Sequence, residues 1–297
     1  MLILYFNILY LYFMEVCILN TLKEAHPYVS ENATIEAHTS PYRHIVIRNL
    51  LKEKPYNEMC HSAKDVLKQS SPSFKYHGGV TYSACMATLT PENMKDGYDF
   101  FGSPEWKNCV SKLFNIQFNK LIMLSAHHHT APSKSGWVHA DLSICSYNDD
   151  ENRSIIIGPN GANYIDDTAN RQPKSTKCVR RVACLYYFNN KEDITEQDGG
   201  STAIYDASGK KMVKKVIPEN NSVLLFEISP TSYHTYVGAT FDRTALVHWF
   251  HSSISQYVYD NRDTLDTNNI PFERWIPAEM IFDYKREEDY KKLFELK

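Results

Sequence analysis

The segment VRRVACLYYF, residues 179–188, decides the fold class. After its two arginines it is an apolar run of aromatic and β-branched residues, which is typical of a strand. Comparable short runs stand at 121–125, 201–205, 222–228 and 244–250, and turn signals lie at 199–200, 208–209 and 218–221. Several short strands at this spacing predict a β-sandwich or jelly roll.

The region before these strands mixes strand and helix patterns. Residues 42–48 alternate and are rich in β-branched residues, which predicts a strand, whereas the apolar spacing within 54–68 predicts a helix. Ser103 followed by Pro104 predicts the start of a second helix, with the serine as N-cap. The expected fold class is therefore mainly β with flanking helices (α+β), around a jelly-roll core at about 121–250.

The composition is that of an ordinary globular protein with many aromatic residues. The 297 residues are 43% hydrophobic and 23% charged, with 20 Tyr and 14 Phe. Because the net charge is −3 and no basic stripe or polybasic cluster occurs, the sequence predicts no nucleic-acid partner and no clear membrane partner. Seven cysteines, an odd number without a C-x-x-C pair, predict reduced thiols and a cytoplasmic protein.

The ends of the chain and one insertion differ from the main domain. The expected divisions are an apolar N-terminal extension at 1–20, a main domain at 41–253 and a C-terminal extension at 254–297. The almost wholly apolar residues 1–13 predict either an upstream stretch before a true start at Met14, or a segment that anchors the chain or directs secretion. The polar stretch 148–177 predicts a substrate lid or a disordered loop, with a short strand at 155–157. Residues 283–297 predict a charged surface helix.

A candidate metal site begins with His139 and Asp141. In an extended segment, residues two apart point to the same face, so this pair can grip one metal ion. The pair alone is weak evidence for a metal site, because a chain with 12 histidines in 297 residues is expected to contain about one His-x-Asp by chance. His234 follows the strand expected at 222–228, and a jelly roll brings such distant strands side by side. Two histidines and one carboxylate form the facial triad of non-heme Fe(II) sites, which leaves positions open for a keto acid and O2.

Arg243 supplies a cation near this triad. It follows His234 by nine residues and stands at the head of the strand expected at 244–250. A buried guanidinium has the fork geometry that grips a carboxylate with two hydrogen bonds. The alternative is a surface arginine in a turn beside Asp242.

These motifs occur in an order that carries a specific resemblance. They are RRVACLYYFN at 180–189, DGGSTAIY at 198–205, VIPENNSVLLF at 216–226, His234, Arg243 and Trp249. In this order the chain resembles the prolyl 4-hydroxylase branch of the Fe(II)- and 2-oxoglutarate-dependent oxygenases, over roughly Leu121 to Phe250. The resemblance implies a double-stranded β-helix, the cupin-like jelly roll.

The resemblance also implies roles for individual residues. The implied iron ligands are His139, Asp141 and His234. Arg243 matches the residue that pairs with the distal carboxylate of 2-oxoglutarate. Tyr187 matches a tyrosine that helps to bind this carboxylate in some members, with plain core packing as the alternative, and Trp249 matches a wall of the pocket. Val247 departs from relatives that place a hydroxyl residue there, which weakens any close substrate analogy.

The implied activity is that of a dioxygenase that hydroxylates an unactivated C–H bond. It would use Fe(II), 2-oxoglutarate and O2, with ascorbate as an optional further cofactor. A protein or peptide side chain, proline first, is the expected substrate, and a small molecule is the alternative. Two other classes compete: a jelly roll that binds a metal or ligand without catalysis, and a zinc hydrolase with the same three ligands.

Three consecutive histidines, His127 to His129, have no role in the resemblance. In a strand, the first and third would share one face and the second would take the other. They could form part of the active-site rim, a second metal site, or surface residues at a strand end, and the sequence leaves these three interpretations open.

Overall fold

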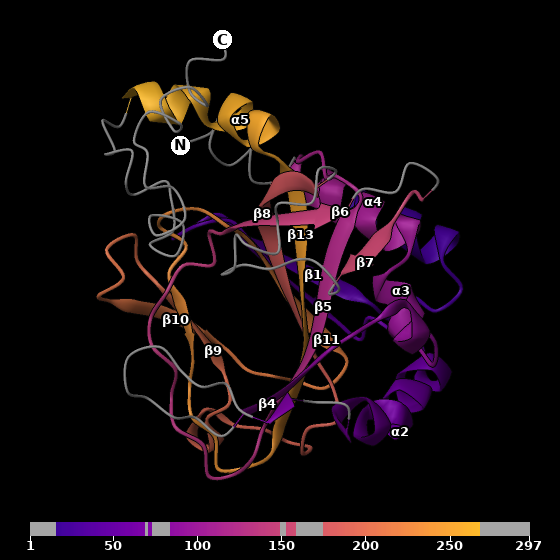
Figure 1. Ribbon diagram of the computed structural model, residues 1–297. Helices are drawn as coiled ribbons and strands as arrows, with labels where there is room; N and C mark the ends of the chain where they lie inside the picture. Colours follow the sequence, from indigo (N-terminus) through magenta and orange to yellow (C-terminus); the bar gives the residue numbers. More distant parts are fainter. Residues whose placement is uncertain (1–15, 69–70, 73–83, 149–152, 159–174, 268–297) are drawn as a thin grey trace.

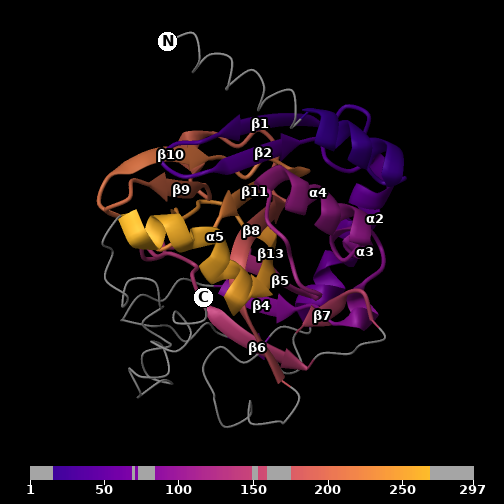
Figure 2. The ribbon, with the colours of Figure 1, turned by 90° about the horizontal axis from the view of Figure 1, so that it is seen from above.

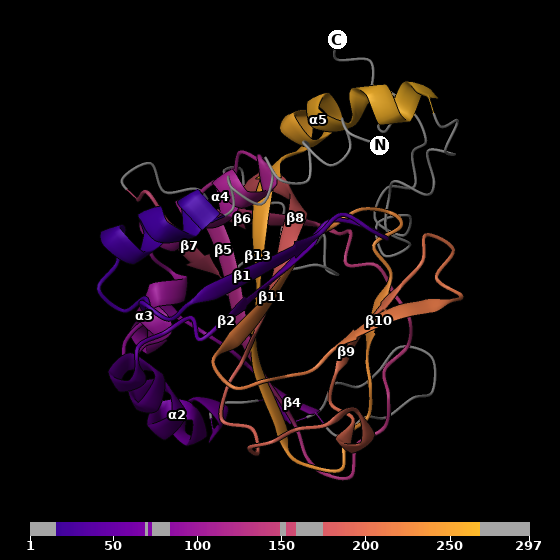
Figure 3. The same ribbon diagram turned by 180° about the vertical axis from the view of Figure 1, so that it is seen from behind.

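A large central sheet organises the protein, with helices on one side and a small sheet on the other (Figures 1 and 3). The computed structural model describes residues 16–68, 71–72, 84–148, 153–158 and 175–267. The large sheet has the spatial order β1 (Thr34–His38), β2 (His44–Arg48), β11 (Ser222–Glu227), β8 (Ser175–Tyr187), β13 (Arg243–Ser253), β5 (Leu121–His129), β4 (Ala84–Thr88), β3 (Ser71–Pro72). Two further strands join it, β6 (Ile144–Asn148) beside β8 and β7 (Ile156–Gly158) beside β5.

The small sheet faces the other side of the large one. Its order is β10 (Met212–Val216), β9 (Thr202–Tyr205), β12 (His234–Tyr236). Two facing sheets with strands that return from distant parts of the chain form a jelly roll. The predicted fold class, mainly β with flanking helices, is confirmed.

Helices cover the opposite face of the large sheet. They are α2 (Glu53–Lys68), α3 (Tyr98–Phe101) and α4 (Pro104–Phe114), while α5 (Ile254–Thr267) follows β13 at one end of the sheet (Figure 2). Short 3-10 turns occupy Pro91–Asn93 and Glu196–Asp198, and residues 16–25 are also helical. None of the helices in these described ranges combines the length and apolar character needed to cross a membrane.

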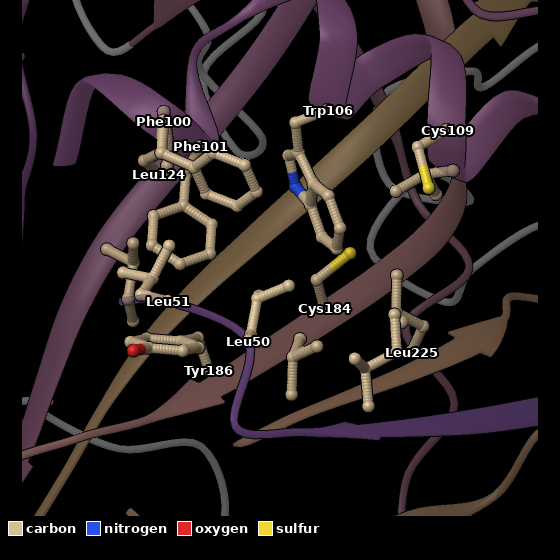
Figure 4. Close-up of a cluster of buried hydrophobic side chains, with 14 of the residues drawn as sticks. Leu50, Leu51, Phe100, Phe101, Trp106, Cys109, Leu124, Cys184, Tyr186 and Leu225 are labelled. Carbon is tan, nitrogen blue, oxygen red and sulfur yellow. The ribbon is translucent and has the colours of Figure 1, made fainter. Parts of the chain in front are cut away.

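Successive side chains of β13 belong alternately to two hydrophobic clusters, one on each face of the large sheet. Leu246 and Phe250 belong to the cluster between the sheet and the helices, where Trp106 is also buried. Figure 4 shows part of this cluster, with Trp106 of α4 above Cys184 of β8. Ala245 and Val247 belong instead to the cluster between the two sheets. Because successive strand residues point to opposite faces, the odd-numbered residues of β13 line the interior of the jelly roll.

The helix start expected at Ser103 is present. The Ser103 hydroxyl accepts a hydrogen bond from the backbone N–H of Trp106 at 3.2 Å, and Pro104 is the first residue of α4. Asn115 ends the helix in the left-handed region with a φ of 55°. A serine cap satisfies one of the backbone donors that a helix start otherwise leaves open.

The turn at Gly199 and Gly200 requires glycine. Both residues have a φ of 75°, and a Cβ atom on Gly199 would lie 1.9 Å from the carbonyl oxygen of Gly238. Only a residue without a side chain fits both this backbone conformation and this close approach. The turn brings the chain into β9 beside the segment that follows His234, through a bridge between Gly199 and Ala239.

The other predicted elements can be compared strand by strand. The strands expected at 121–125, 179–188, 201–205, 222–228 and 244–250 are confirmed as β5, β8, β9, β11 and β13. The strand expected at 42–48 and the helix expected at 54–68 correspond to β2 and α2. Within the polar stretch 148–177, β7 is the expected short strand, but most of the stretch lies outside the described residues, as do 1–13 and 283–297. The five cysteines with described side chains are all free thiols.

Candidate metal and co-substrate site

The structure brings His139, Asp141 and His234 together. One ligand atom from each side chain lies within 4.8 Å of the other two, and this is the group in the described residues that could hold a metal ion. The His139 Nε2 atom is 3.6 Å from Oδ1 of Asp141, and the His234 Nε2 atom is 3.9 Å from Oδ2. The two imidazole rings lie 4.5 Å apart between centroids.

Backbone hydrogen bonds hold the two histidines in register. The N–H of His139 donates to the carbonyl of His234 at 3.0 Å, and the reverse bond is 2.9 Å. This bridge joins β12 of the small sheet to the segment that leads from β5, although the two residues are far apart in sequence. A jelly roll was expected to bring His234 to the pair in this way.

The same ring atom of each histidine faces the metal group. Nδ1 of His139 lies 2.9 Å from the carbonyl oxygen of Trp137, and Nδ1 of His234 lies 3.1 Å from that of Ser232. A carbonyl can only accept, so each Nδ1 carries the proton and each Nε2 is left with a lone pair. Two such lone pairs and one carboxylate are a donor set that suits Fe(II).

The charge states of His234 and Asp141 are those of metal ligands. Burial, followed by the charge of His139, lowers the pKa of His234 to about 4, so this imidazole is neutral near pH 7. Burial alone would raise the pKa of Asp141, but the charges of His234, Arg180 and His139 and a hydrogen bond from Trp249 lower it to about 2. A neutral imidazole and an ionised carboxylate are the forms that bind a metal.

Arg243 lies at the deep end of the interior face. It is 2% exposed, and its guanidinium carbon lies 5.1 Å from the ring centre of Tyr187 and 5.2 Å from that of Tyr236. Its Nε and Nη2 atoms have no hydrogen-bond partner among the described residues. A buried cation with two open donors could bind a carboxylate, since leaving such donors unpaired is costly. The alternative of a surface arginine is wrong.

Tyr187 and Trp249 lie at opposite ends of this face. The Tyr187 hydroxyl shares a 2.8 Å hydrogen bond with the Thr202 hydroxyl, and its ring contacts Arg243. The Trp249 indole N–H donates to Oδ2 of Asp141 at 2.8 Å. Tyr187 is therefore beside the candidate carboxylate receptor, while Trp249 is beside the candidate metal group. Whether either contacts the co-substrate stays a prediction.

Three further side chains around the site had no role in the sequence interpretation. The Arg180 guanidinium lies 3.8 Å from Oδ1 of Asp141 and 4.2 Å from the Trp249 ring centre. The hydroxyl of Tyr236 shares a 2.6 Å hydrogen bond with Ser133. Tyr236 could have been found, because it stands two residues after His234 and so faces the same side of a strand. No sequence pattern indicates the position of Arg180, because Asp141 and Trp249, which it contacts, lie in distant segments of the chain.

The histidines of β5 lie partly inside the protein. His129 is 3% exposed and its ring stacks on Tyr236 with centroids 4.0 Å apart. His128 points to the other face, where Nδ1 lies 3.0 Å from the Thr244 hydroxyl. The interpretation as surface residues is therefore wrong for His129. The metal group found in the described residues does not include these histidines.

Comparison with known proteins gives a family match. Residues 159–251 match the model of the 2OG-Fe(II) oxygenase superfamily, a stretch that contains His234, Arg243 and Trp249. His139 and Asp141 lie before the matched stretch, so their placement comes from the geometry above. No curated protein matches the chain.

Several solved structures are similar at low identity. A prolyl-4-hydroxylase from Pseudomonas putida has 14% identity and a TM-score of 0.45, covering 79% of this chain and 98% of that one. A prolyl hydroxylase from Trichoplax adhaerens, in complex with a hypoxia inducible factor oxygen degradation domain peptide fragment, has 14% identity and a TM-score of 0.49, covering 82% and 92%. A viral collagen prolyl hydroxylase from Paramecium Bursaria Chlorella virus-1 has 14% identity and a TM-score of 0.43, covering 70% and 96%.

These structural likenesses are weak, so the family assignment rests on the matched residues 159–251 and on the site itself. The match and the His-Asp-His group agree with each other, since this family binds Fe(II). A non-catalytic binding module and a zinc hydrolase do not account for the match. Over residues 159–251 the chain matches the 2OG-Fe(II) oxygenase superfamily, and its His-Asp-His group is a donor set that suits the Fe(II) of a 2-oxoglutarate-dependent dioxygenase.

Proposed function

We propose that His139, Asp141 and His234 hold the Fe(II) and that Arg243 binds the distal carboxylate of 2-oxoglutarate. We further propose that the enzyme hydroxylates a protein or peptide side chain, with peptidyl proline as the first candidate. One observation carries the proposal: a three-ligand metal group shares the interior of the jelly roll with a buried arginine that has two open donors. The domain division at 41–253 stays a prediction.

The chain's own residues would prepare both ends of the co-substrate. The Trp249 N–H fixes one oxygen of Asp141, and the two backbone carbonyls fix the tautomers of the histidines. At the other end Arg243 orients the co-substrate by its carboxylate, so that its keto-acid end points to the metal group. When bound, Fe(II) with 2-oxoglutarate and O2 supplies the oxidising power that inserts one oxygen atom into a C–H bond.

The difference in exposure between the two ends supports a large substrate. The side chain of His139 is 36% exposed, whereas Arg243 is 2% exposed. The metal end therefore reaches the surface, and the co-substrate end lies deep. A protein or peptide can present one side chain at such a site without entering the interior. The prolyl 4-hydroxylase-like order of motifs supports proline, and a small molecule remains the second candidate.

The cofactor assignment can be tested directly. Under anaerobic conditions, Fe(II) and 2-oxoglutarate together should give a weak visible charge-transfer band, and with O2 they should give succinate. Asp141→Ala should abolish both signals, because it removes the charged ligand of the metal. Asp206→Ala, at a half-buried turn carboxylate that is not part of the metal group, is the matched control and should leave both signals unchanged. An Asp141→Ala variant that forms succinate at the parent rate would show that the ligand assignment is wrong.

The substrate class needs a separate experiment. Proline-containing peptides and free amino acids are incubated with the enzyme, Fe(II), 2-oxoglutarate and ascorbate, and mass spectrometry is used to look for a gain of one oxygen atom. The proposal expects the gain on a proline within a peptide, located by fragmentation. A gain confined to free amino acids would contradict the protein or peptide assignment and favour the small-molecule alternative.

A further inference from the structure

The histidines of β5 are the sequence motif that the proposed function does not use. β5 runs antiparallel to β13, with His129 opposite Arg243 and His127 opposite Ala245. Residues directly opposite each other in an antiparallel pair project from the same face of the sheet. His127 and His129 therefore share the interior face with Arg243, and His128 projects from the face that the helices cover.

His127 belongs to a row of three residues across the sheet. On the other side of β13, Ala245 is opposite Tyr187 of β8, so the row reads His127, Ala245, Tyr187. The small side chain of Ala245 stands between the two rings, so a ligand that lies over Ala245 would be flanked by both. This row lies two residues from Arg243 in the direction of Trp249, a step of about 7 Å along the strand.

His127 lies between Arg243, at one end of the site, and Trp249, at the end of the metal group. Its ring centre is 6.4 Å from that of Trp249, whose N–H holds Asp141. The Nε2 atom is shielded from solvent. Burial, followed by the positive charge of Arg243, lowers the pKa of His127 to about 3, and the charge of Asp141 acts in the opposite direction. The imidazole is thus uncharged near pH 7 and offers one N–H donor.

We propose that His127 is a further co-substrate-binding residue, whose imidazole N–H donates a hydrogen bond to the metal-proximal carboxylate of 2-oxoglutarate. This inference rests on the proposed function, in which Arg243 holds the distal carboxylate. A five-carbon dicarboxylate anchored at Arg243 and directed to the metal group must cross the row of His127 and Tyr187. Its second carboxylate then comes within reach of a donor on β5.

The test measures the dissociation constant of 2-oxoglutarate by anaerobic titration of the Fe(II)-loaded protein, with the visible band as readout. His127→Phe keeps a ring of similar shape but removes the donor, and it should weaken binding by roughly 10- to 100-fold, the range for a hydrogen bond to a charged group. His127→Gln restores a donor and should lose less affinity. His128→Phe, in the same strand but on the other face, should leave the dissociation constant unchanged.

Fe(II) affinity without 2-oxoglutarate is measured for each variant, because it separates the two proposals. If the parent gives no band, the proposed function fails, and the inference fails with it. If the parent gives the band and His127→Phe binds 2-oxoglutarate as tightly as the parent, the inference alone is overturned. A His127→Phe variant that loses Fe(II) binding would overturn it as well, since the side chain would then serve the metal group.

A measurement on the parent protein covers the case in which His127→Phe does not fold. In protein labelled with nitrogen-15 histidine and loaded with diamagnetic Zn(II), addition of 2-oxoglutarate should protect one imidazole N–H from exchange with water. The protected resonance should be present in His128→Phe. Its absence from the parent would overturn the inference.

Discussion

Replacing Arg243 with methionine should change stability in opposite directions without and with 2-oxoglutarate. Without the co-substrate, the guanidinium is 2% exposed, and neither an ion pair nor partners for Nε and Nη2 occur among the described residues. Replacing a buried charge with an apolar side chain of similar volume is often neutral or stabilising, by about 1–4 kcal/mol. The stacked rings of Tyr187 and Tyr236 offset part of this gain, since each cation–π contact contributes about 0.5–1 kcal/mol.

The expected net gain is about 1 kcal/mol for Arg243→Met without ligand. For a protein of this size that corresponds to a rise in Tm of roughly 2–4 °C. With 2-oxoglutarate at a hundred times its dissociation constant, the Fe(II)-loaded parent should gain about 2.7 kcal/mol from binding, and the variant should gain almost none. The variant is therefore expected to be the more stable protein without co-substrate and the less stable one with it.

Thermal unfolding with and without 2-oxoglutarate, in the presence of Fe(II) under anaerobic conditions, measures both effects. The matched control is Arg181→Met, which replaces another buried arginine, but one whose Nη1 donates to Asp260 at 2.7 Å. That variant should be less stable than the parent and should keep the gain from 2-oxoglutarate. If Arg243→Met unfolds at a lower temperature than the parent without ligand, protein groups satisfy the guanidinium. If it retains the gain from 2-oxoglutarate, Arg243 is not the carboxylate receptor.

Two other predictions concern residues outside the metal group. Gly199→Ala should destabilise the protein by more than about 1 kcal/mol in urea unfolding, because its Cβ would meet the Gly238 carbonyl and its φ is positive; equal stability would mean that the turn can relax. His248 is fully buried among aromatic rings, and burial lowers its pKa to about 3 from 6.5, so the folded state resists its protonation. The stability associated with the neutral ring is present above pH 6.5 and is lost by about 1.4 kcal/mol per pH unit as the pH falls toward 3. His248→Phe should therefore show a shallower loss of unfolding free energy between pH 7 and pH 5, and equal slopes for both proteins would contradict this account.

Local chemistry explains which parts of the fold the sequence could predict. Ser103 and Pro104 encode the start of α4 by a hydrogen bond within one turn, and the apolar runs encode strands by composition alone. The interior position of His129 could not be predicted in this way. It depends on β5 lying between β4 and β13 in the sheet, and strand order is set by contacts between distant segments.

In the site too, local sequence patterns predict some residues, whereas contacts between distant segments determine the others. His139 and Asp141 could be paired from their spacing, and Arg243 from its place after His234. The contacts of Arg180 with Asp141 and Trp249 join three segments, so no spacing in the sequence indicates them. A residue that supports a ligand from another strand is found only once the register of the sheet is known.

The origin of the three candidate ligands has a consequence for folding. His234 belongs to β12 of the small sheet, whereas Asp141 is held to the large sheet by the N–H of Trp249 on β13. A metal ion bound to both would cross-link the two sheets beside the backbone bridge that pairs His234 of β12 with His139. Because a metal that binds the folded state adds its binding free energy to folding, Fe(II) should stabilise this junction most. Hydrogen exchange should accordingly slow most at the amides of β12 and of the segment around His139 when the metal is added, and much less in α2, which lies on the far face of the large sheet.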